Sequence, residues 1–323
     1  MRRREFIGLV SGAVAWPLAA RAQQPAGRMW RIGFLASTPP TPIMVSALRE
    51  GLRDRGYVDG QNLSIDIRWL LDENPHVAAE LAHSGVDLIV AWATPAATAA
   101  RNATTTVPIV MVSIADPVGS GIVAELARPG GNITGLSNMS TELSGKLVQL
   151  LMDIVPGIKR VGVVSNSKNP GATALSLRET EAAIRAVGLQ TEVVDAEAAE
   201  EYDSAFARLS AADVGGVVLL PDAALIRHRT RIADLAIKAR LPTVFQRREN
   251  AEAGGLLSYG SNLSDLLRQS ALFVDRILKG ARPAGLPVEQ PTKFTLAINL
   301  KTAKALGLTI PPTLLATANE VIE

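Results

Sequence analysis

Two stretches of the chain, RIGFLAS at residues 31–37 and RVGVVSN at residues 160–166, decide the fold because they repeat one pattern. Each begins with a basic residue, continues with apolar residues around a glycine, and ends in small polar residues, which is typical of a buried strand that leads into a loop. Further along, LAHSGVDLIV at residues 81–90 matches LSAADVGGVV at residues 209–218. An offset of roughly 130 residues is too long for a solenoid repeat, so it indicates two similar domains.

Short apolar runs alternate with longer amphipathic runs around these stretches, which predicts an α/β fold with parallel sheets. We expect strands at residues 30–36, 63–69, 87–92, 108–112, 160–164, 191–194, 214–220 and 243–246. Between them, apolar residues at three- and four-residue spacing predict helices at residues 44–55, 77–83, 96–102, 172–187, 202–211 and 224–239.

Further elements follow the second unit and break the simple duplication. They are strands at residues 256–260 and 293–298 and helices at residues 263–279 and 300–306. We therefore expect the chain to cross back between two similar lobes, each a parallel sheet flanked by helices, joined by a multi-segment hinge. The predicted lobes comprise residues 29–138 with 262–287 and residues 139–261 with 288–323.

The N-terminus predicts an export signal over residues 1–22. A run of arginines at residues 2–4 precedes an apolar stretch that ends at Leu18, and Ala20-Arg21-Ala22 supplies a small-residue cleavage site. The apolar stretch is shorter than the roughly 20 residues of a spanning helix, so we expect cleavage after about Ala22 and a protein that is not membrane-embedded. Residues 3–7 resemble a twin-arginine signal, which directs a folded protein to the periplasm. The alternative is an amphipathic first helix of the fold.

Composition excludes several classes of function. Removal of residues 1–22 takes away four arginines and one glutamate, so the formal net charge changes from +2 to −1 and a nucleic-acid partner is not expected. The chain has no cysteine, which excludes disulfides, thiolate metal sites and a lipid-attachment cysteine. His76, His83 and His228 have no nearby set of further ligands, so we expect neither a metal site nor a cofactor.

Candidate binding residues of the first lobe follow its predicted strands, because ligands of open α/β sheets gather at the carboxyl ends of the strands. They are Ser37, Thr38, Thr94, Pro95, Ala96 and Asp116. Thr94 is predicted to cap a helix with Pro95 at the first helical position, which would leave the next N–H groups available to a carboxylate. Asp116 is predicted to pair with a ligand ammonium group. The alternatives are an ordinary cap at Thr94 and an ordinary turn at Asp116.

The equivalent positions of the second lobe are polar as well. Its candidates are Ser165, Asn166 and Asp222, with Tyr259 on the predicted hinge strand. Gln246 and Arg247 also follow a strand, and Trp92 of the first lobe could form an apolar wall. Each residue has an alternative interpretation as a capping, loop or core residue. Their common position at strand ends is what favours a binding site.

One motif favours an enzyme. Residues 119–124, GSGIVA, fit the glycine pattern of a dinucleotide-binding turn, and Glu142 lies about twenty residues further on. The fingerprint should follow its strand directly, whereas residues 114–118 intervene here. We find no nucleophile elbow, phosphate-binding loop or zinc-protease motif in the sequence, so we expect no catalytic activity.

From Arg31 to Glu323 the sequence resembles the substrate-binding proteins of ABC transporters, including those that bind tryptophan. The residues that carry the resemblance are those at 31–35, 51–57, 60–62, 93–97, 116–118, 127–135, 259–260 and 298–308. The resemblance implies a type I periplasmic-binding fold that closes on its ligand and then docks on a permease of the inner membrane. Family members that bind aromatic amino acids make Thr94, Ala96 and Asp116, with residues near Ser165, Asp222 and Tyr259, expected cleft positions.

The sequence therefore predicts a monomeric periplasmic protein that captures a small polar molecule, an amino acid or a related carboxylate, by lobe closure. Two alternatives stay open. One is an α/β enzyme that uses a nucleotide cofactor, and the other is a ligand-sensing module with the same fold.

Overall fold

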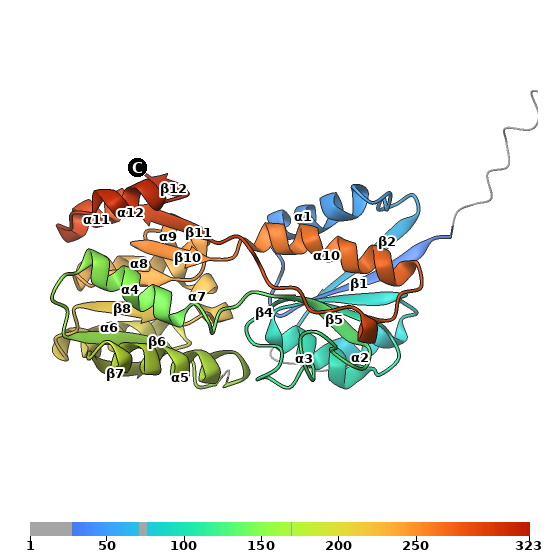
Figure 1. Cartoon of the computed structure of the whole chain (residues 1–323), viewed down its shortest axis with the longest axis horizontal. Helices are drawn as coiled ribbons and strands as arrows, with labels where there is room; N and C mark the ends of the chain where they lie inside the picture. Colours follow the sequence, from blue (N-terminus) through green and yellow to red (C-terminus); the bar gives the residue numbers. More distant parts are fainter. Residues whose placement is uncertain (1–27, 71–75, 169) are drawn as a thin grey trace, which may run out of the picture.

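The structure, a computed structural model, describes residues 28–70, 76–168 and 170–323 (Figure 1). The predicted export signal at residues 1–22 lies outside these residues. Within the described ranges, no helix combines the length and the apolar character needed to cross a bilayer.

The first sheet is five-stranded and parallel, with the order β2-β1-β3-β4-β5. Its strands are β1 (Trp30–Ala36), β2 (Leu63–Trp69), β3 (Leu88–Trp92), β4 (Ile109–Ile114) and β5 (Ile133–Ser137). The flanking helices are α1 (Pro42–Arg53), α2 (His76–His83), α3 (Thr94–Ala103) and α10 (Leu263–Leu278). The order reverses beside β1, so the loops after β1 and β3 diverge and leave a crevice at the carboxyl ends of the strands.

The second sheet has seven strands in the order β12-β11-β10-β9-β8-β6-β7, and only the β10–β11 pair is antiparallel within the described chain. Its strands are β6 (Arg160–Ser165), β7 (Gln190–Asp195), β8 (Gly216–Leu219), β9 (Thr243–Phe245), β10 (Leu257–Gly260), β11 (Thr295–Asn299) and β12 (Glu320–Ile322). Its helices are α4 (Ser144–Ile154), α5 (Pro170–Ala186), α6 (Ala199–Ala211), α7 (Ala223–Arg227), α8 (Arg229–Lys238), α9 (Arg248–Glu252), α11 (Leu300–Leu306) and α12 (Pro312–Thr317).

The repeated sequence pattern corresponds to a repeated packing contact. A Cβ atom on Gly33 of β1 would lie 2.8 Å from Leu81 of α2, and one on Gly162 of β6 would lie 2.7 Å from Leu209 of α6. Each glycine thus lets the leucine of the second repeated stretch pack directly against the strand. The two sheets are equivalent at this level, and the predicted fold of two similar α/β lobes is confirmed.

Helix α10 belongs to the first sheet although it follows most of the second in sequence. Its apolar side chains share a core with strands β1, β3 and β4. Helix α1 crosses it closely, because a Cβ on Gly51 would lie 2.4 Å from the backbone oxygen of Arg268. The Tyr57 hydroxyl donates a hydrogen bond of 3.0 Å to Asp275 of α10, and burial together with this carboxylate raises the pKa of Tyr57 to about 12.

The chain passes between the two sheets three times (Figure 1). The connections run from β5 to α4, from β10 to α10, and from the 3₁₀ turn η1 (Pro283–Gly285) to β11. They form the multi-segment hinge that the sequence predicts. The predicted lobe boundaries, at 138/139, 261/262 and 287/288, we retain as a proposal.

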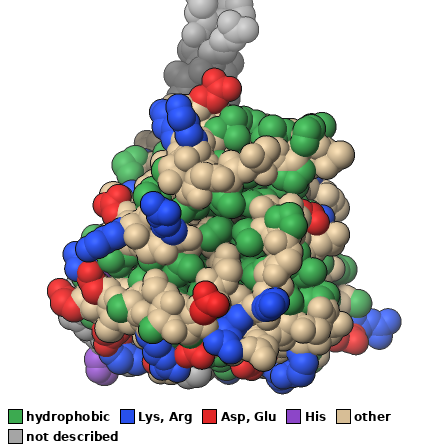
Figure 2. All heavy atoms as spheres, turned by 90° about the vertical axis from the view of Figure 1, so that its left-hand side faces the viewer, with side chains coloured by type: hydrophobic (Ala, Val, Ile, Leu, Met, Phe, Trp, Pro, Cys, Tyr) green, Lys and Arg blue, Asp and Glu red, His purple; other side chains and the backbone are tan. Residues whose placement is uncertain are grey.

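We call the part of the molecule built on the first sheet lobe 1 and the part built on the second sheet lobe 2. The end of lobe 2 that faces away from lobe 1 carries both hydrophobic and charged side chains (Figure 2). Hydrophobic side chains gather near the middle of this face, and Lys, Arg, Asp and Glu side chains lie around them, mainly along its lower edge. This face therefore carries no extended patch of a single charge, which agrees with the small net charge of the chain.

The sequence analysis predicts neither the strands β5 and β12 nor the helices α4, α9 and α12, and it joins α7 and α8 into one helix. Strand β5 is missed because it contains the polar Thr134. This residue is fully buried, and its hydroxyl donates a hydrogen bond of 2.7 Å to the Leu286 carbonyl. Strand β12 is three residues long, too short for a periodic pattern. The helix predicted at residues 224–239 is two helices, because His228, with φ −103° and ψ 14°, ends α7 and precedes α8.

Candidate ligand-binding site

A pocket lies at the carboxyl ends of the strands and receives residues from both lobes and from the first hinge connection. Lobe 1 contributes Ser37, Thr38, Trp92, Ala93, Thr94, Pro95, Ser113 and Ala115. The connection contributes Asn138 and Ser140, and lobe 2 contributes Pro221, Asp222, Ile226 and Arg247. Of the residues predicted from the sequence, Ser37, Thr38, Thr94, Pro95 and Asp222 line it.

The wall of lobe 1 is organised by Ser37. Its hydroxyl donates to the Trp92 carbonyl at 3.1 Å and accepts the backbone N–H of Ala96 at 3.1 Å. The prediction that this N–H is available to a ligand is therefore wrong. The predicted cap is also displaced by one residue, because Ala93 is the N-cap of α3 and Thr94 is its first helical residue.

Strained backbone lies beside the pocket. Ala93, Ser113 and Met139 are non-glycine residues with φ of 69°, 63° and 56°. The first two line the pocket, and Met139 lies between two lining residues of the hinge connection. Two other described non-glycine residues with positive φ, Asp213 and Arg240, follow helices of lobe 2 away from this wall. Such conformations cost about 1–3 kcal/mol each and tend to cluster at functional sites.

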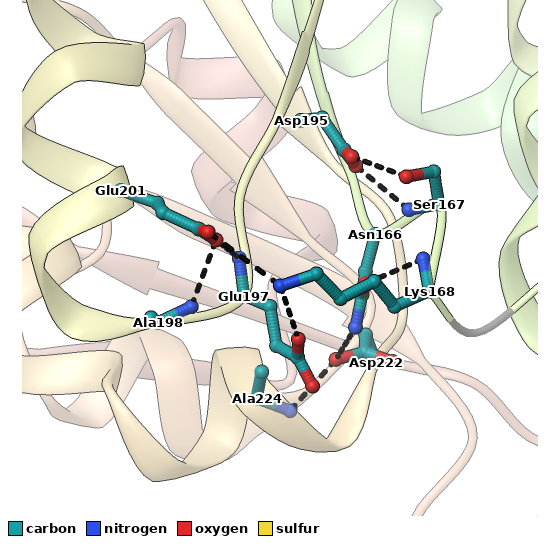
Figure 3. A network of polar contacts seen from close by, with 9 residues as sticks. All are labelled: Asn166, Ser167, Lys168, Asp195, Glu197, Ala198, Glu201, Asp222 and Ala224. Carbon is teal, nitrogen blue, oxygen red and sulfur yellow. Dashed lines mark hydrogen bonds and ion pairs between the residues drawn. The ribbon is translucent and has the colours of Figure 1, made fainter.

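The wall of lobe 2 presents a fixed carboxylate. Asp222 is the N-cap of α7, and its Oδ1 accepts the N–H of Ala224 at 2.8 Å and the amide Nδ2 of Asn166 at 3.2 Å (Figure 3). The Asn166 Oδ1 in turn accepts the N–H of Lys168 at 3.0 Å, and the Lys168 ammonium pairs with Glu197 at 3.1 Å. Asn166 is 5% exposed and does not line the pocket, so it supports Asp222 from behind.

Arg247 places a positive charge in the same pocket. It follows β9, and its guanidinium carbon lies 5.8 Å from the ring centroid of Trp92 in the other lobe. Burial lowers the pKa of the Arg247 guanidinium from its ordinary value, and the charge of Glu249 partly opposes this effect. No acidic side chain of the described residues forms an ion pair with Arg247. A half-buried guanidinium without such a partner is suited to an anionic ligand.

Four further predicted residues do not line the pocket. The Asp116 Oδ1 accepts the N–H groups of Val118 at 3.1 Å and Gly119 at 2.7 Å. These hydrogen bonds agree with the alternative that Asp116 forms an ordinary turn. Ala96 is fully buried in the core of lobe 1, and Ser165 is 7% exposed at the end of β6. Tyr259 packs on the core of lobe 2 and stacks on Phe294, with ring centroids 5.8 Å apart.

The glycine motif at residues 119–124 lacks the context of a dinucleotide site. It lies in turns between β4 and β5, and the described residues between these strands include no helix. The glycines therefore do not lead into a helix N-terminus that could face a pyrophosphate. In the ranges that the structure describes, no group of three His, Cys, Asp or Glu side chains is placed to hold a metal ion.

A family model described as ABC transporter substrate binding protein matches residues 34–322, nearly the whole described chain. The chain belongs to this family. The binding protein is 28% identical over 269 residues to a tyrosine-binding protein of Clostridioides difficile, and the match covers 80% of this chain and 75% of that protein.

Two solved structures are similar along almost all of the binding protein. An ABC domain in complex with L-Trp from Streptococcus pneumonia has a TM-score of 0.84 and 28% identity, with 91% of this chain and 99% of that chain covered. A conserved domain protein from Vibrio cholerae has a TM-score of 0.83 and 29% identity, with 91% and 100% covered. The resemblance predicted from the sequence is confirmed.

Proposed function

We propose that the binding protein captures an α-amino acid in the pocket between its lobes, delivers it to an inner-membrane permease, and catalyses no reaction. The observation that carries the proposal is the pair of opposite charges, Asp222 and Arg247, on the lobe 2 wall of one pocket. An α-amino acid is the small molecule that places an ammonium group and a carboxylate within reach of two such side chains.

In this arrangement the Arg247 guanidinium holds the ligand carboxylate, because it offers several donors in a planar fork. Asp222 holds the ammonium group, since Ala224 and Asn166 fix its carboxylate in place. The sequence assigns this role to Asp116, whose carboxylate instead accepts two N–H groups of its own turn. Our proposal therefore transfers the role to Asp222.

Lobe 1 completes the pocket from the opposite side. Trp92 is 7% exposed and offers an apolar surface, and Thr94 lines the same wall. A ligand that contacts both lobes binds the closed form better than the open form, so it drives closure. The names of two relatives, a tyrosine-binding protein and an L-Trp complex, support an amino acid as the ligand class.

The finer features of the proposal rest on the sequence. The leader at residues 1–22 supports export by the twin-arginine route and cleavage after about Ala22. We also propose that the protein is a monomer in the periplasm and that it serves a permease of the inner membrane; the leader and the family support the location and the kind of partner. We propose no nucleic-acid partner and no cofactor.

The test is a thermal-shift screen of the full-length chain against the amino acids, small carboxylates and nucleotides, followed by calorimetry on each compound that stabilises it. A ligand at 100 times its dissociation constant adds about 2.7 kcal/mol to the free energy of unfolding. We expect stabilisation by one or a few amino acids. Stabilisation by NAD(P) alone would overturn the proposal in favour of a nucleotide-dependent enzyme.

A further inference from the structure

The pocket between the lobes is small. Its volume is about 80 Å³. For comparison, an apolar protein cavity of about 150 Å³ holds one benzene molecule. An aromatic amino acid carries such a ring and a methylene group in addition to its ammonium and carboxylate groups. The pocket in this structure therefore has too little room for an aromatic amino acid.

Two lining residues of opposite lobes lie too close together to admit a ring between them. The Arg247 guanidinium carbon of lobe 2 lies 5.8 Å from the centroid of the Trp92 ring of lobe 1. Nonbonded carbon atoms pack about 3.5–4.0 Å apart, so a flat ring fits between two surfaces only where they are about 7 Å apart or more. A ligand whose carboxylate binds Arg247 therefore cannot place an aromatic ring between the guanidinium and the indole.

Hydrogen bonds hold one side of the pocket in place. In the first hinge connection, the Asn138 amide donates to the Ser113 hydroxyl of β4 at 3.1 Å, and the Ser140 hydroxyl donates to the Asn138 Oδ1 at 2.6 Å. Gln246 directly precedes Arg247 and is 7% exposed, and its Nε2 donates to the Ser140 carbonyl at 2.7 Å. These bonds connect β4, the hinge connection and the end of β9. A wider pocket on this side would break them, and a buried polar group left without a partner is costly.

The largest apolar side chains of the pocket come from opposite lobes. They are Trp92 and Ile226, whereas the other apolar lining residues are alanines and prolines. Ile226 is the fourth residue after Asp222, so about one helical turn separates it from the carboxylate that, on our proposal, holds the ligand ammonium group. These two side chains therefore occupy space that a larger ligand side chain would need.

We propose that the pocket selects α-amino acids with small side chains and excludes aromatic ones, and that Trp92 and Ile226 set this limit. The inference rests on the proposed function, because it names the class of amino acid that the same site accepts. A small side chain leaves the spacing of Arg247 and Trp92 unchanged, whereas a ring would have to separate them. The binding protein then differs in its ligand from the relatives whose names state tyrosine and L-Trp.

The test is calorimetry of the full-length wild-type chain with each of the standard amino acids. One methylene group too many in an apolar pocket changes selectivity about 10- to 200-fold. We therefore expect the amino acid that binds most tightly to have a side chain no larger than that of valine. Phenylalanine, tyrosine and tryptophan should each bind at least about tenfold more weakly than this ligand.

Ile226→Ala enlarges the pocket and supplies a second measurement. The ratio of the affinity for aromatic amino acids to the affinity for the best small one should rise at least about tenfold, because the lost side chain opens space beside the ammonium site. Ile237→Ala is the matched control, since Ile237 of α8 is half-buried like Ile226 and does not line the pocket. This variant should keep the wild-type ratio.

The possible failures are distinguishable. If the tightest ligand of the wild type has a side chain larger than that of valine, the inference is overturned and the proposed function stands. An equal ratio in Ile226→Ala and wild type would overturn the assignment of the limit to Ile226. A chain that binds no amino acid at all would overturn the proposed function and this inference with it.

Discussion

The two lobes use one equivalent position in different ways. Ser37 and Asn166 each end the repeated stretch, and each supports the helix that follows the next strand of the core in its own lobe. Ser37 bonds directly to the backbone of α3, whereas Asn166 bonds to Asp222, the N-cap of α7. In lobe 1 this hydrogen bond therefore occupies a backbone N–H group and adds no charge to the pocket wall. In lobe 2 the equivalent hydrogen bond holds a carboxylate in place. Under the proposed function, the charges that select the ligand come from lobe 2, and lobe 1 provides the surface that closes on it.

The largest effect should come from Arg247→Ala in lobe 2. Loss of a partner in a buried charge pair costs about 2–5 kcal/mol, so the affinity for the amino acid found in the screen should fall at least about 30-fold by calorimetry. Arg248→Ala is the matched control, because the Arg248 guanidinium is half-exposed and pairs with Glu252 and Glu320. Equal affinities in Arg247→Ala and wild type would show that lobe 2 does not provide the anion site.

A comparison of two acids, one from each lobe, tests the second charge. Asp222→Asn should weaken binding about 10- to 100-fold, since a charge-assisted hydrogen bond is worth about 1.5–3 kcal/mol. Asp116→Asn should leave the affinity at neutral pH within about threefold and lower the free energy of unfolding by about 0.5–1 kcal/mol through its turn. If calorimetry showed a larger loss of affinity in Asp116→Asn than in Asp222→Asn, the ammonium site would lie in lobe 1.

The equivalence of the two cores can be tested at the paired glycines. Gly33→Ala and Gly162→Ala should each lower the free energy of unfolding by about 1–3 kcal/mol, because each new methyl group meets a buried leucine closer than van der Waals contact. Gly145→Ala, in helix α4 with open space around its Cβ position, should raise stability by about 0.5–1 kcal/mol. Denaturant titration measures all three. Very unequal losses at Gly33 and Gly162 would show that the lobes repeat in topology and differ in packing.

The smallest effects on affinity and stability should come from substitution of Ser37 and Asn166, the two residues that support the helices α3 and α7. Ser37→Ala removes the hydrogen bond to the N–H of Ala96 and should cost about 1 kcal/mol in stability with less than a threefold change in affinity. Asn166→Ala releases Asp222 on one side and should reduce affinity about three- to tenfold at a similar cost in stability. If both variants changed affinity equally, the supports would have the same role in the two lobes.

Strand periodicity predicts most of the fold, because buried parallel strands are short, continuous apolar runs. The predicted bounds of β1 and β2 agree with the structure at both ends. β5 could not be found in this way, since its sequence, ITGLS, is largely polar and small, and the Thr134 hydroxyl is satisfied by a carbonyl 152 residues away. Such a partner exists only after the chain has folded.

The candidate site could be predicted to the edge of the sheet where the pocket lies, and only partly to the side chains that line the pocket. The strand-end rule identifies Ser37, Thr94 and Asp222, and it also includes Ser165 and Asp116, because it does not say which side chain bonds to its own loop. Arg247 has the same strand-end signal and was not selected. Its charge, placed directly after the buried strand β9, is the signal that could have singled it out.

The close crossing of α1 and α10 has a consequence for biosynthesis. Because α10 supplies part of the core of lobe 1, that lobe stays incomplete until residue 278 has left the ribosome, long after its own five strands have been made. Lobe 1 is encoded first and can be completed only late, so its nascent sheet must keep an apolar face uncovered during most of synthesis. A stalled or truncated chain that ends before α10 should therefore aggregate through that face and be a preferred client of chaperones.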